Sequence, residues 1–318
     1  DWAVYGPFSS LNDKQEVAIS QDGQKEAMEH AGRTGGLPFV GVGWYRTEFD
    51  VPQFQAGKRA TILFDGAMSH ANVYINGQKV GYWPYGYNSF HFDITKYLKP
   101  GEKNTLAVRL ENLPESSRWY PGAGLYRNVH LIITEDAYIP VWGTYITTPS
   151  VNEKFAKVNV RTKVVLPEGA DPAKYSVETS VWNPNKQKLT AVRTSLAQMK
   201  YNNNQAEQEF VIQAPSLWSP EMPALYSAET RLYEGDKLKD IYTTPFGIRS
   251  IEIIPDKGFF LNGKRTVFKG VCNHHDLGPL GAAVNDAAIR RQIRILKDMG
   301  CNAIRTSHNM PAPELIRA

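Results

Sequence analysis

The sequence has few cysteines and no long apolar run, and each absence excludes a class of protein. Only two cysteines, Cys272 and Cys301, occur in 318 residues, which rules out a disulfide-stapled scaffold. Their spacing is not that of a CxxC zinc or redox site, so we expect both to be small buried core residues. No stretch approaches the roughly 18 apolar residues of a membrane-spanning helix, and residues 1–8 lack the segments of a signal peptide. We therefore expect no membrane partner.

Basic residues are not concentrated anywhere in the chain. The 36 Lys and Arg exceed the 32 Asp and Glu by four, and they are scattered singly or in pairs. Nucleic-acid-binding proteins gather such residues on one face, so a nucleic-acid partner is not indicated. Apolar residues make up 42% and charged residues 21% of the sequence, close to the globular average. A chain of 318 residues then predicts two or three folded domains.

The first part of the chain has the spacing of β-strands. Apolar and polar residues alternate from Trp44 to about Glu135, in short runs rich in Val, Ile, Tyr, Phe and Thr. Asn76-Gly77 suits a two-residue hairpin, because both residues tolerate a positive φ. We predict an antiparallel sandwich over residues 1–136. Its clearest runs are 44–51, 60–65, 71–75, 89–94, 105–110 and 126–134.

A second group of strands follows an interruption at Pro140 and Gly143. Turns containing Pro or Gly separate the runs over about 110 residues, the size of an immunoglobulin-like sandwich. Neither cysteine lies in this part, so an inter-sheet disulfide is excluded. We predict this domain over residues 137–248. Its runs are 157–165, 175–181, 208–212, 226–233 and 239–243.

Residues 249–318 change to a strand, a helix and a second strand. The helix is predicted over 286–299, with Asn285 as its N-terminal cap and Gly300 at its C-terminal end. Strands predicted at 266–272 and 301–305 flank it and complete one βαβ unit. Such a unit makes its two strands parallel, so their C-terminal ends open on the same side.

The densest polar clusters in the chain follow these two strands directly. In a (β/α)₈ barrel the active site lies at this end of the strands, and two strands cannot close a barrel that needs eight. We therefore interpret residues 249–318 as the start of a larger catalytic domain. The alternative is that these residues are polar only because they lie in solvated loops. A metal site at His274, His275 and Asp276 is disfavoured, because adjacent residues of an extended segment point in opposite directions. The clusters are Asn273, His274, His275 and Asp276, and Arg305, Thr306, Ser307, His308 and Asn309.

Retaining glycoside hydrolysis needs two carboxylates about 5 Å apart, and these clusters do not supply them. Only Asp276 and Glu314 lie near the predicted rim. Glu314 follows two prolines and is interpreted as a charge at a helix N-terminus. No catalytic pair can be named from these residues.

Aromatic residues of the first domain allow two interpretations. Trp83, Pro84 and Tyr85 form one group, and Arg118 and Trp119 lie in another. Aromatic rings stack on sugar rings, but they also pack cores, and packing is the preferred interpretation for most of them. Arg118 and Trp119 are the exceptions and are kept as candidates for sugar binding. The loop that follows them contains two glycines, so it can be directed across a domain junction.

Several strings resemble glycoside hydrolase family 2. The family combines a sugar-binding jelly roll, an immunoglobulin-like sandwich and a (β/α)₈ barrel, and the resemblance covers nearly the whole chain. The barrel strings are the most specific. The matching strings are GVGWYRTEFDVP (41–52), FDGAMSHANVYINGQKVG (64–81), SRWYPGAGLYRNVHL (117–131), LWSPEMPALY (217–226), FGIRSIE (246–252), FFLNGKRTVFKGVCNHHD (259–276) and DMGCNAIRTSHNMP (298–311).

The resemblance implies which residues contact a sugar. His275 and His308 resemble residues that recognise the non-reducing end, and Arg305 resembles an arginine beside the nucleophile. Asn309 stands where related β-galactosidases have a tyrosine, and Ser117 stands where the larger β-galactosidases have an aspartate. Asp276 completes the candidate set. The family's two catalytic glutamates are expected beyond Ala318, so we expect this chain to be a piece that is inactive alone.

The implied enzyme is a retaining exo-β-glycosidase that acts on a carbohydrate substrate, first of all a β-galactosidase. A β-glucuronidase or β-mannosidase of the same family is the alternative, as is a non-catalytic carbohydrate-binding protein. The family leaves open a divalent or monovalent cation in the full-length enzyme, a homo-oligomer and a periplasmic or secreted location. We expect the C-terminal segment to pack on the second sandwich, on a neighbouring copy or on the rest of a barrel.

Overall fold

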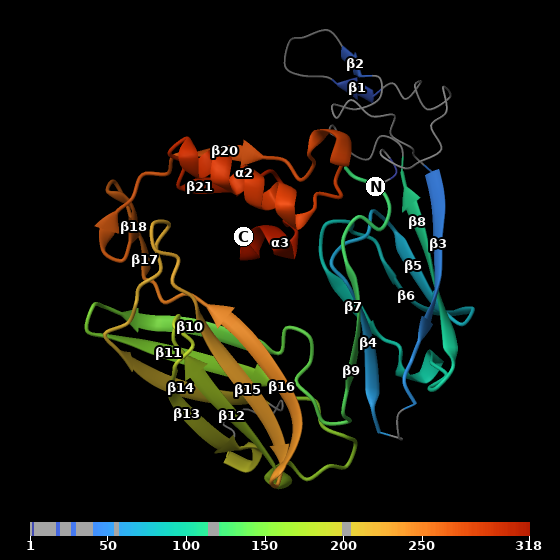
Figure 1. Ribbon diagram of the computed structural model, residues 1–318, viewed down its shortest axis with the longest axis horizontal. Coiled ribbons are helices and arrows are strands. Elements are labelled where there is room, and N and C mark those ends of the chain that lie inside the picture. Colours follow the sequence, from blue (N-terminus) through green and yellow to red (C-terminus); the bar gives the residue numbers. More distant parts are fainter. Residues whose placement is uncertain are drawn as a thin grey trace. The chain divides into compact units, whose positions relative to one another are not determined.

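The computed structural model describes residues 2, 17–19, 27–29, 41–53, 57–113, 121–198 and 205–318 (Figure 1). The chain forms two compact units. The first joins Asp1–Ile133 to Lys269–Ala318, and the second is Thr134–Phe268. Ser117, Arg118 and Trp119 lie outside the described residues.

The first unit contains a sandwich of a four-stranded and a three-stranded sheet. Alternate residues of its strands face the core, where the rings of Phe64 and Phe90 stack at 4.8 Å. The four-stranded sheet has the order β3 (Gly41–Asp50), β8 (Lys103–Asn112), β5 (Ala71–Ile75), β6 (Gln78–Trp83). The other has the order β7 (Phe90–Asp93), β4 (Arg59–Phe64), β9 (Val129–Thr134), and β1 (Val17–Ile19) pairs with β2 (Ala27–Glu29). In the sandwich β3 pairs with β8, β8 with β5, β5 with β6, and β4 with β7, all antiparallel.

The predicted runs and the predicted hairpin of this sandwich are confirmed. Each run overlaps one of these strands, with ends that differ by a few residues. Asn76 and Gly77 both have a positive φ, of 50° and 79°, and connect β5 to β6. This is the backbone that a two-residue turn between twisted antiparallel strands requires.

The second unit is another antiparallel sandwich, again with three and four strands. Val158, Val160, Val177 and Leu232 are among its fully buried side chains. The first sheet has the order β10 (Thr144–Val151), β11 (Phe155–Lys163), β14 (Gln205–Gln213). The second has the order β13 (Lys188–Ser195), β12 (Tyr175–Trp182), β15 (Tyr226–Glu234), β16 (Lys237–Phe246). A hairpin sheet of β17 (Ile251–Ile254), β18 (Gly258–Leu261) and β19 (Lys264–Arg265) follows.

Two strands of this sandwich, β10 and β13, were not predicted from the sequence. Both are edge strands whose residues are mostly half-buried or exposed, so their apolar residues do not alternate strictly.

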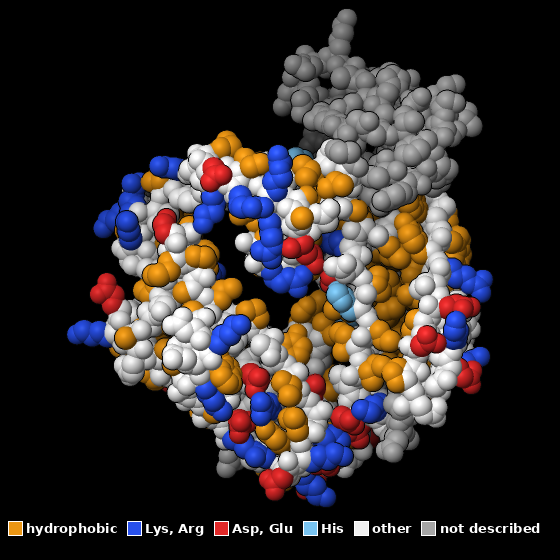
Figure 2. All heavy atoms as spheres, in the orientation of Figure 1, with side chains coloured by type: hydrophobic (Ala, Val, Ile, Leu, Met, Phe, Trp, Pro, Cys, Tyr) orange, Lys and Arg blue, Asp and Glu red, His pale blue; other side chains and the backbone are white. Residues whose placement is uncertain are grey.

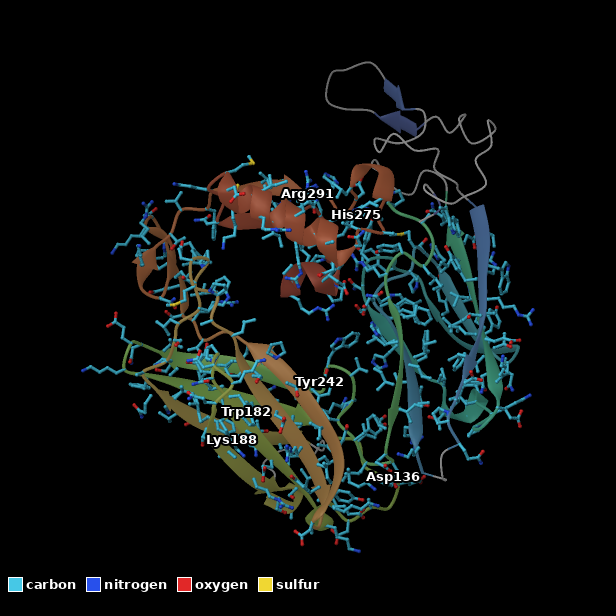
Figure 3. The ribbon with its side chains drawn as sticks, in the orientation of Figure 1. Asp136, Trp182, Lys188, Tyr242, His275 and Arg291 are labelled. Atoms are coloured by element: carbon cyan, nitrogen blue, oxygen red, sulfur yellow. The ribbon has the colours of Figure 1, made fainter. Side chains whose placement is uncertain are left out.

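An ion pair with a buried lysine lies at the opposite edge of the four-stranded sheet. Lys239 in β16 has a buried side chain and lies 2.8 Å from Asp136, which Figure 3 labels. Its hydrogen bond is the main reason that the pKa of Asp136 is lowered.

The C-terminal segment forms the predicted βαβ unit. Strands β20 (Gly270–Asn273) and β21 (Ala303–Thr306) are parallel, and α2 (Asp286–Asp298) connects them. The Asn285 side chain accepts a hydrogen bond from the Ala288 amide at 2.9 Å, and Gly300 has a φ of +84°, so both predicted caps are confirmed. A short η5 (Gly278–Leu280) precedes α2, and α3 (Pro313–Arg317) ends the chain.

Two expectations about this segment were wrong. The first strand begins at Gly270 rather than at Thr266, because the Thr266 amide bonds back to Phe259 in the preceding hairpin. Cys272 is exposed and Cys301 is only half-buried. Cys272 pairs in register with Arg305, so the two side chains share one face of the small sheet, and that face is open. The segment also packs with the first sandwich, which the sequence analysis did not consider.

Within the described ranges, no helix combines the length and the apolar composition needed to cross a bilayer.

Two valines on adjacent strands of one sheet test the core of the second unit. Val158 in β11 is fully buried, whereas Val211 in β14 is 50% exposed. We expect Val158→Ala to lower the free energy of unfolding by about 1.5–3 kcal/mol, through lost burial and a residual cavity. Val211→Ala removes the same atoms from the open face and should change it by no more than about 0.5 kcal/mol. Urea unfolding of both variants checks this, and equal losses would contradict the assigned faces.

Candidate functional site

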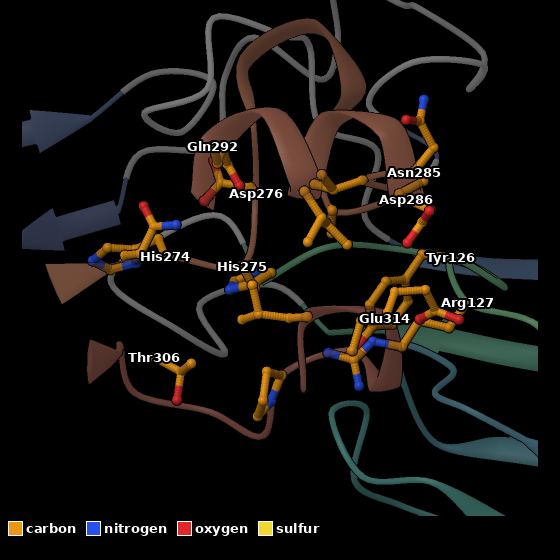
Figure 4. Close-up of a pocket in the computed structure, with 18 of the residues that line it drawn as sticks. Tyr126, Arg127, His274, His275, Asp276, Asn285, Asp286, Gln292, Thr306 and Glu314 are labelled. Atoms are coloured by element: carbon orange, nitrogen blue, oxygen red, sulfur yellow. The ribbon is translucent and has the colours of Figure 1, made fainter. Parts of the chain in front are cut away.

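A cavity of about 660 Å³ lies inside the first unit (Figure 4). Part of its wall comes from the sandwich, where Tyr126, Arg127 and Asn128 precede β9. The rest comes from the βαβ unit, namely the residues that follow β20 and β21 and the facing sides of α2 and α3. Segments far apart in the sequence therefore build one site.

The two predicted polar clusters meet. Asn273 and Thr306 are paired in the parallel sheet, and the Ser307 amide donates to the Asn273 carbonyl at 2.9 Å. The rings of His274 and His308 lie 5.9 Å apart, edge to face. The convergence expected from parallel strands is thus confirmed, because both clusters begin where their strands end.

Side chains of these clusters divide between two sides. Most members of both clusters line the cavity, namely Asn273, His274, His275, Asp276, Thr306, Ser307 and Asn309. Arg305 is exposed and lies outside the cavity lining, with its guanidinium 3.6 Å from the Cys272 sulfur.

The exposed side carries Arg305 and a histidine. His308 is exposed and is also not among the cavity-lining residues. The Arg305 guanidinium, followed by Ser307, lowers the pKa of the Cys272 thiol by hydrogen bonding. An arginine and a histidine on one open surface are hydrogen-bond donors suited to hydroxyl or carboxylate oxygens.

His275 lies between the sandwich and the βαβ unit, and both of its ring nitrogens are buried. Its ring meets Tyr87 edge to face at 4.9 Å. Neither ring nitrogen has a hydrogen-bond partner of good geometry among the described residues. Burial lowers the pKa of His275 to about 4, although the neighbouring Asp276 carboxylate opposes the shift. The imidazole is therefore neutral at pH 7 and forms part of the wall (Figures 3 and 4).

Asn309 connects the second cluster to the sandwich. The Tyr85 hydroxyl donates to Asn309 Oδ1 at 3.3 Å, while Asn309 Nδ2 is buried and, within the described part of the chain, lacks a partner. Tyr85 is 46% exposed, whereas Trp83 of the same aromatic group packs against the core ring of Phe90. Core packing is therefore correct for Trp83 but not for Tyr85.

Arg127 is a site residue that sequence reasoning missed. Its guanidinium donates to the carbonyls of Asp65 and Tyr87 at 3.2 and 2.7 Å, both in the sandwich. It also donates to the Met310 carbonyl at 2.9 Å, in the segment after β21. The sequence pointed to Arg127 only through its position in SRWYPGAGLYRNVHL (117–131), one of the strings that resemble the family.

Charges at the cavity are largely paired. Asp286 lies 2.8 Å from Arg290, and Glu314 lies 2.7 Å from Arg317. Glu314 stands in the first turn of α3, as predicted, and also accepts a hydrogen bond from Asn128 at 3.1 Å. Figure 2 shows Lys and Arg side chains gathered over α2 and α3. Among the described residues, no group of three or more His, Cys, Asp or Glu is arranged to hold a metal ion.

Three family models match consecutive parts of the chain. The sugar binding domain of glycosyl hydrolases family 2 matches residues 37–135, the family's central domain matches 138–249, and its TIM barrel domain matches 252–317. The chain belongs to glycosyl hydrolase family 2. The family 2 sugar-binding sandwich, the immunoglobulin-like sandwich and the opening βαβ unit of a TIM barrel are thus present, and the predicted fold class is confirmed.

Named relatives of this family 2 chain differ in activity. A β-galactosidase of Bacteroides ovatus is 43% identical over 99% of this chain, and a putative β-glucuronidase of Formosa agariphila is 39% identical over 89%. The chain spans 35% and 26% of the lengths of these relatives. A family 2 crystal structure from Bacteroides cellulosilyticus superposes with a TM-score of 0.83, at 33% identity over 96% of this chain and 43% of that one.

Replacement of Arg127 by lysine should loosen the joint between the sandwich and the βαβ unit. A lysine keeps the charge but cannot donate along three fixed directions, so carbonyls now paired would lose their donor. We expect a loss of about 1–3 kcal/mol in unfolding free energy, and faster amide hydrogen exchange in residues 303–318. Arg291→Lys, on the exposed side of α2, is the matched control. Unchanged exchange in the Arg127 variant would contradict the bridging role.

The buried His275 predicts a pH dependence of stability. Its folded-state pKa of about 4 lies below the ordinary value of 6.5, so its contribution is complete above pH 6.5 and is lost as the pH falls toward 4. His275→Phe removes this titration. The loss of unfolding free energy between pH 7 and pH 5 should then be smaller by about 2 kcal/mol than in the parent.

Urea unfolding at both pH values measures this difference. His274→Phe, which changes the exposed neighbouring histidine, is the matched control. A His275→Phe variant with the parent's pH dependence would show that burial of this ring does not control acid stability.

Proposed function

We propose that this chain is the N-terminal part of a retaining exo-β-glycosidase that removes terminal β-galactosyl groups. The observation that carries the proposal is the convergence of two polar clusters at the C-terminal ends of parallel strands β20 and β21. Active sites of (β/α)₈ enzymes are built at this end of the strands. The named β-galactosidase relative, at 43% identity, supports galactose as the sugar.

The proposed roles of the site residues follow their exposure. Arg305 and His308 stand on the open side, where they can contact a sugar or the carboxylate of a nucleophile. Asp276 and Asn309 line the cavity, and the buried Asn309 Nδ2 is a donor suited to a sugar hydroxyl or another acceptor. The His275 ring packs on Tyr87, which supports a role as part of the wall of the substrate site.

The catalytic carboxylates are proposed to lie outside this chain. Glu314 is engaged by Arg317 and Asn128, which supports its role as a helix-end charge rather than as a nucleophile. We therefore propose that the isolated chain is inactive. Domains are proposed at residues 1–136, 137–248 and 249–318, and a homo-oligomer is left open.

A β-glucuronidase is the second candidate, because one relative at 39% identity carries that name. Glucuronides differ from galactosides by a carboxylate, which needs a free cation for tight binding. Arg290 and Arg317 at the cavity are already paired with carboxylates, which favours a neutral sugar at this side.

Kinetics of the complete protein encoded by the gene test this proposal. The kcat/KM for 4-nitrophenyl β-galactoside should exceed that for the β-glucuronide and the β-mannoside by roughly tenfold or more, because sites built to bond one set of hydroxyls reject others. The chain alone should show no turnover. A faster glucuronide would replace galactose as the substrate, and no turnover of any glycoside by the complete protein would leave a carbohydrate-binding protein.

A further inference from the structure

The four-stranded sheet of the first unit has one buried and one open face. On β8, Leu106, Val108 and Leu110 face the core and are at most 9% exposed. The residues between them point to the other side, together with Val42, Trp44 and Arg46 of β3, which are all exposed. This outward side is called the outer face below.

A straight row of side chains crosses the outer face. Trp44 in β3 pairs with Arg109 in β8, Arg109 pairs with Asn72 in β5, and Asn72 pairs with Tyr82 in β6. Directly paired residues of antiparallel strands lie on the same face. Because neighbouring strands are about 4.8 Å apart, the row extends over roughly 14 Å, which is longer than one sugar ring.

Aromatic rings stand at both ends of this row. Trp44 is 60% exposed, and its ring lies 5.7 Å from that of Tyr74. At the other end Tyr82 is 45% exposed, and its hydroxyl lies 2.6 Å from His70 Nδ1, which holds the phenol in place. Fixed, exposed rings offer flat surfaces at little entropic cost on binding.

Polar side chains fill the space between the rings. Arg109 and Glu111 form an ion pair at 3.0 Å, with 28% and 36% of their side chains exposed. The Asn72 side-chain amide donates to the His70 carbonyl at 3.1 Å, which leaves its oxygen on the same face as the row. Paired charges and an amide offer donors and acceptors without a net charge, and this suits a ligand rich in hydroxyls.

We propose that the outer face is a binding surface for a neutral polysaccharide, held by stacking on Trp44, Tyr74 and Tyr82 and by hydrogen bonds to Asn72, Arg109 and Glu111. The sugar binding domain match over residues 37–135 supports this class of ligand, and the outer face lies within it. Exposed aromatic rings with amide, carboxylate and guanidinium groups beside them match the two chemical aspects of a sugar, its apolar face and its polar rim.

The outer face is also connected to the candidate site. Tyr82 at the end of the row and Tyr85, which bonds to Asn309, are three residues apart, so their backbones are within about 10 Å. A glycan on the outer face would therefore lie close to the site where chain ends are proposed to be cleaved. This inference goes beyond that cleavage, since binding at the outer face needs no catalytic residue.

Affinity gel electrophoresis of the 318-residue chain tests the surface. The gels contain β-1,4-galactan, whose choice rests on the proposed function, or hydroxyethylcellulose, which tests the surface without it. We expect retardation by at least one polysaccharide, and a dissociation constant about tenfold weaker for Trp44→Ala and for Tyr82→Ala. Trp142→Ala removes a tryptophan of similar exposure, 58%, from the second unit and should bind as the parent does.

Urea unfolding of each variant separates lost binding from lost folding. Retardation by hydroxyethylcellulose alone would support the outer face while counting against galactose specificity. No retardation by either polysaccharide would overturn the proposal, as would unchanged binding by a folded Trp44→Ala chain. Sedimentation that shows a dimer dissolved by Trp44→Ala would also overturn it, because the face would then join two copies of the chain.

Discussion

The three hydrogen bonds of Arg127 are the interaction on which the arrangement of the first unit depends. A guanidinium donates in fixed directions within one plane, so its carbonyl acceptors in the sandwich and after β21 must hold a definite relation. The apolar cluster of Met68, Tyr87, Tyr126 and Ala282 adds contact beside it. Burial raises the pKa of Tyr126 to about 12, and its hydroxyl donates to the Gly86 carbonyl at 2.9 Å. The cavity exists because these contacts fix both of its walls.

The polar clusters have two different electrostatic environments as a result. His275 lies against the sandwich, its ring nitrogens lose their contact with water, and the ring stays neutral at pH 7. His308 and Arg305 point to the open side, where charge is readily solvated. One short segment after each strand therefore supplies both an apolar wall and a polar surface. A family 2 glycosidase needs both, because a sugar ring has apolar faces and polar edges.

The sandwich contributes more than support for the barrel. Its loop before β9 lines the cavity, and Tyr85 in the loop before β7 bonds to the cavity-lining Asn309. The outer face of its four-stranded sheet is separate and carries exposed rings. Buried and outward-facing residues alternate strictly along β8, so one face of the sheet can bind a ligand while the other stabilises the fold. Leu106, Val108 and Leu110 pack the core, so the residues between them are free to differ without loss of burial.

The sequence by itself determined the fold class, the Asn76-Gly77 hairpin, the caps of α2 and the meeting of the two polar clusters. Each depends on local backbone preferences or on the geometry of a single βαβ unit. Only the tertiary structure decided that His275 is buried, that Cys272 is exposed, that the βαβ unit packs with the first sandwich and that Arg127 bridges them. Those properties depend on contacts between residues far apart in the chain, which no spacing pattern records. The row from Trp44 to Tyr82 is of the same kind, since it follows from the order and register of four strands.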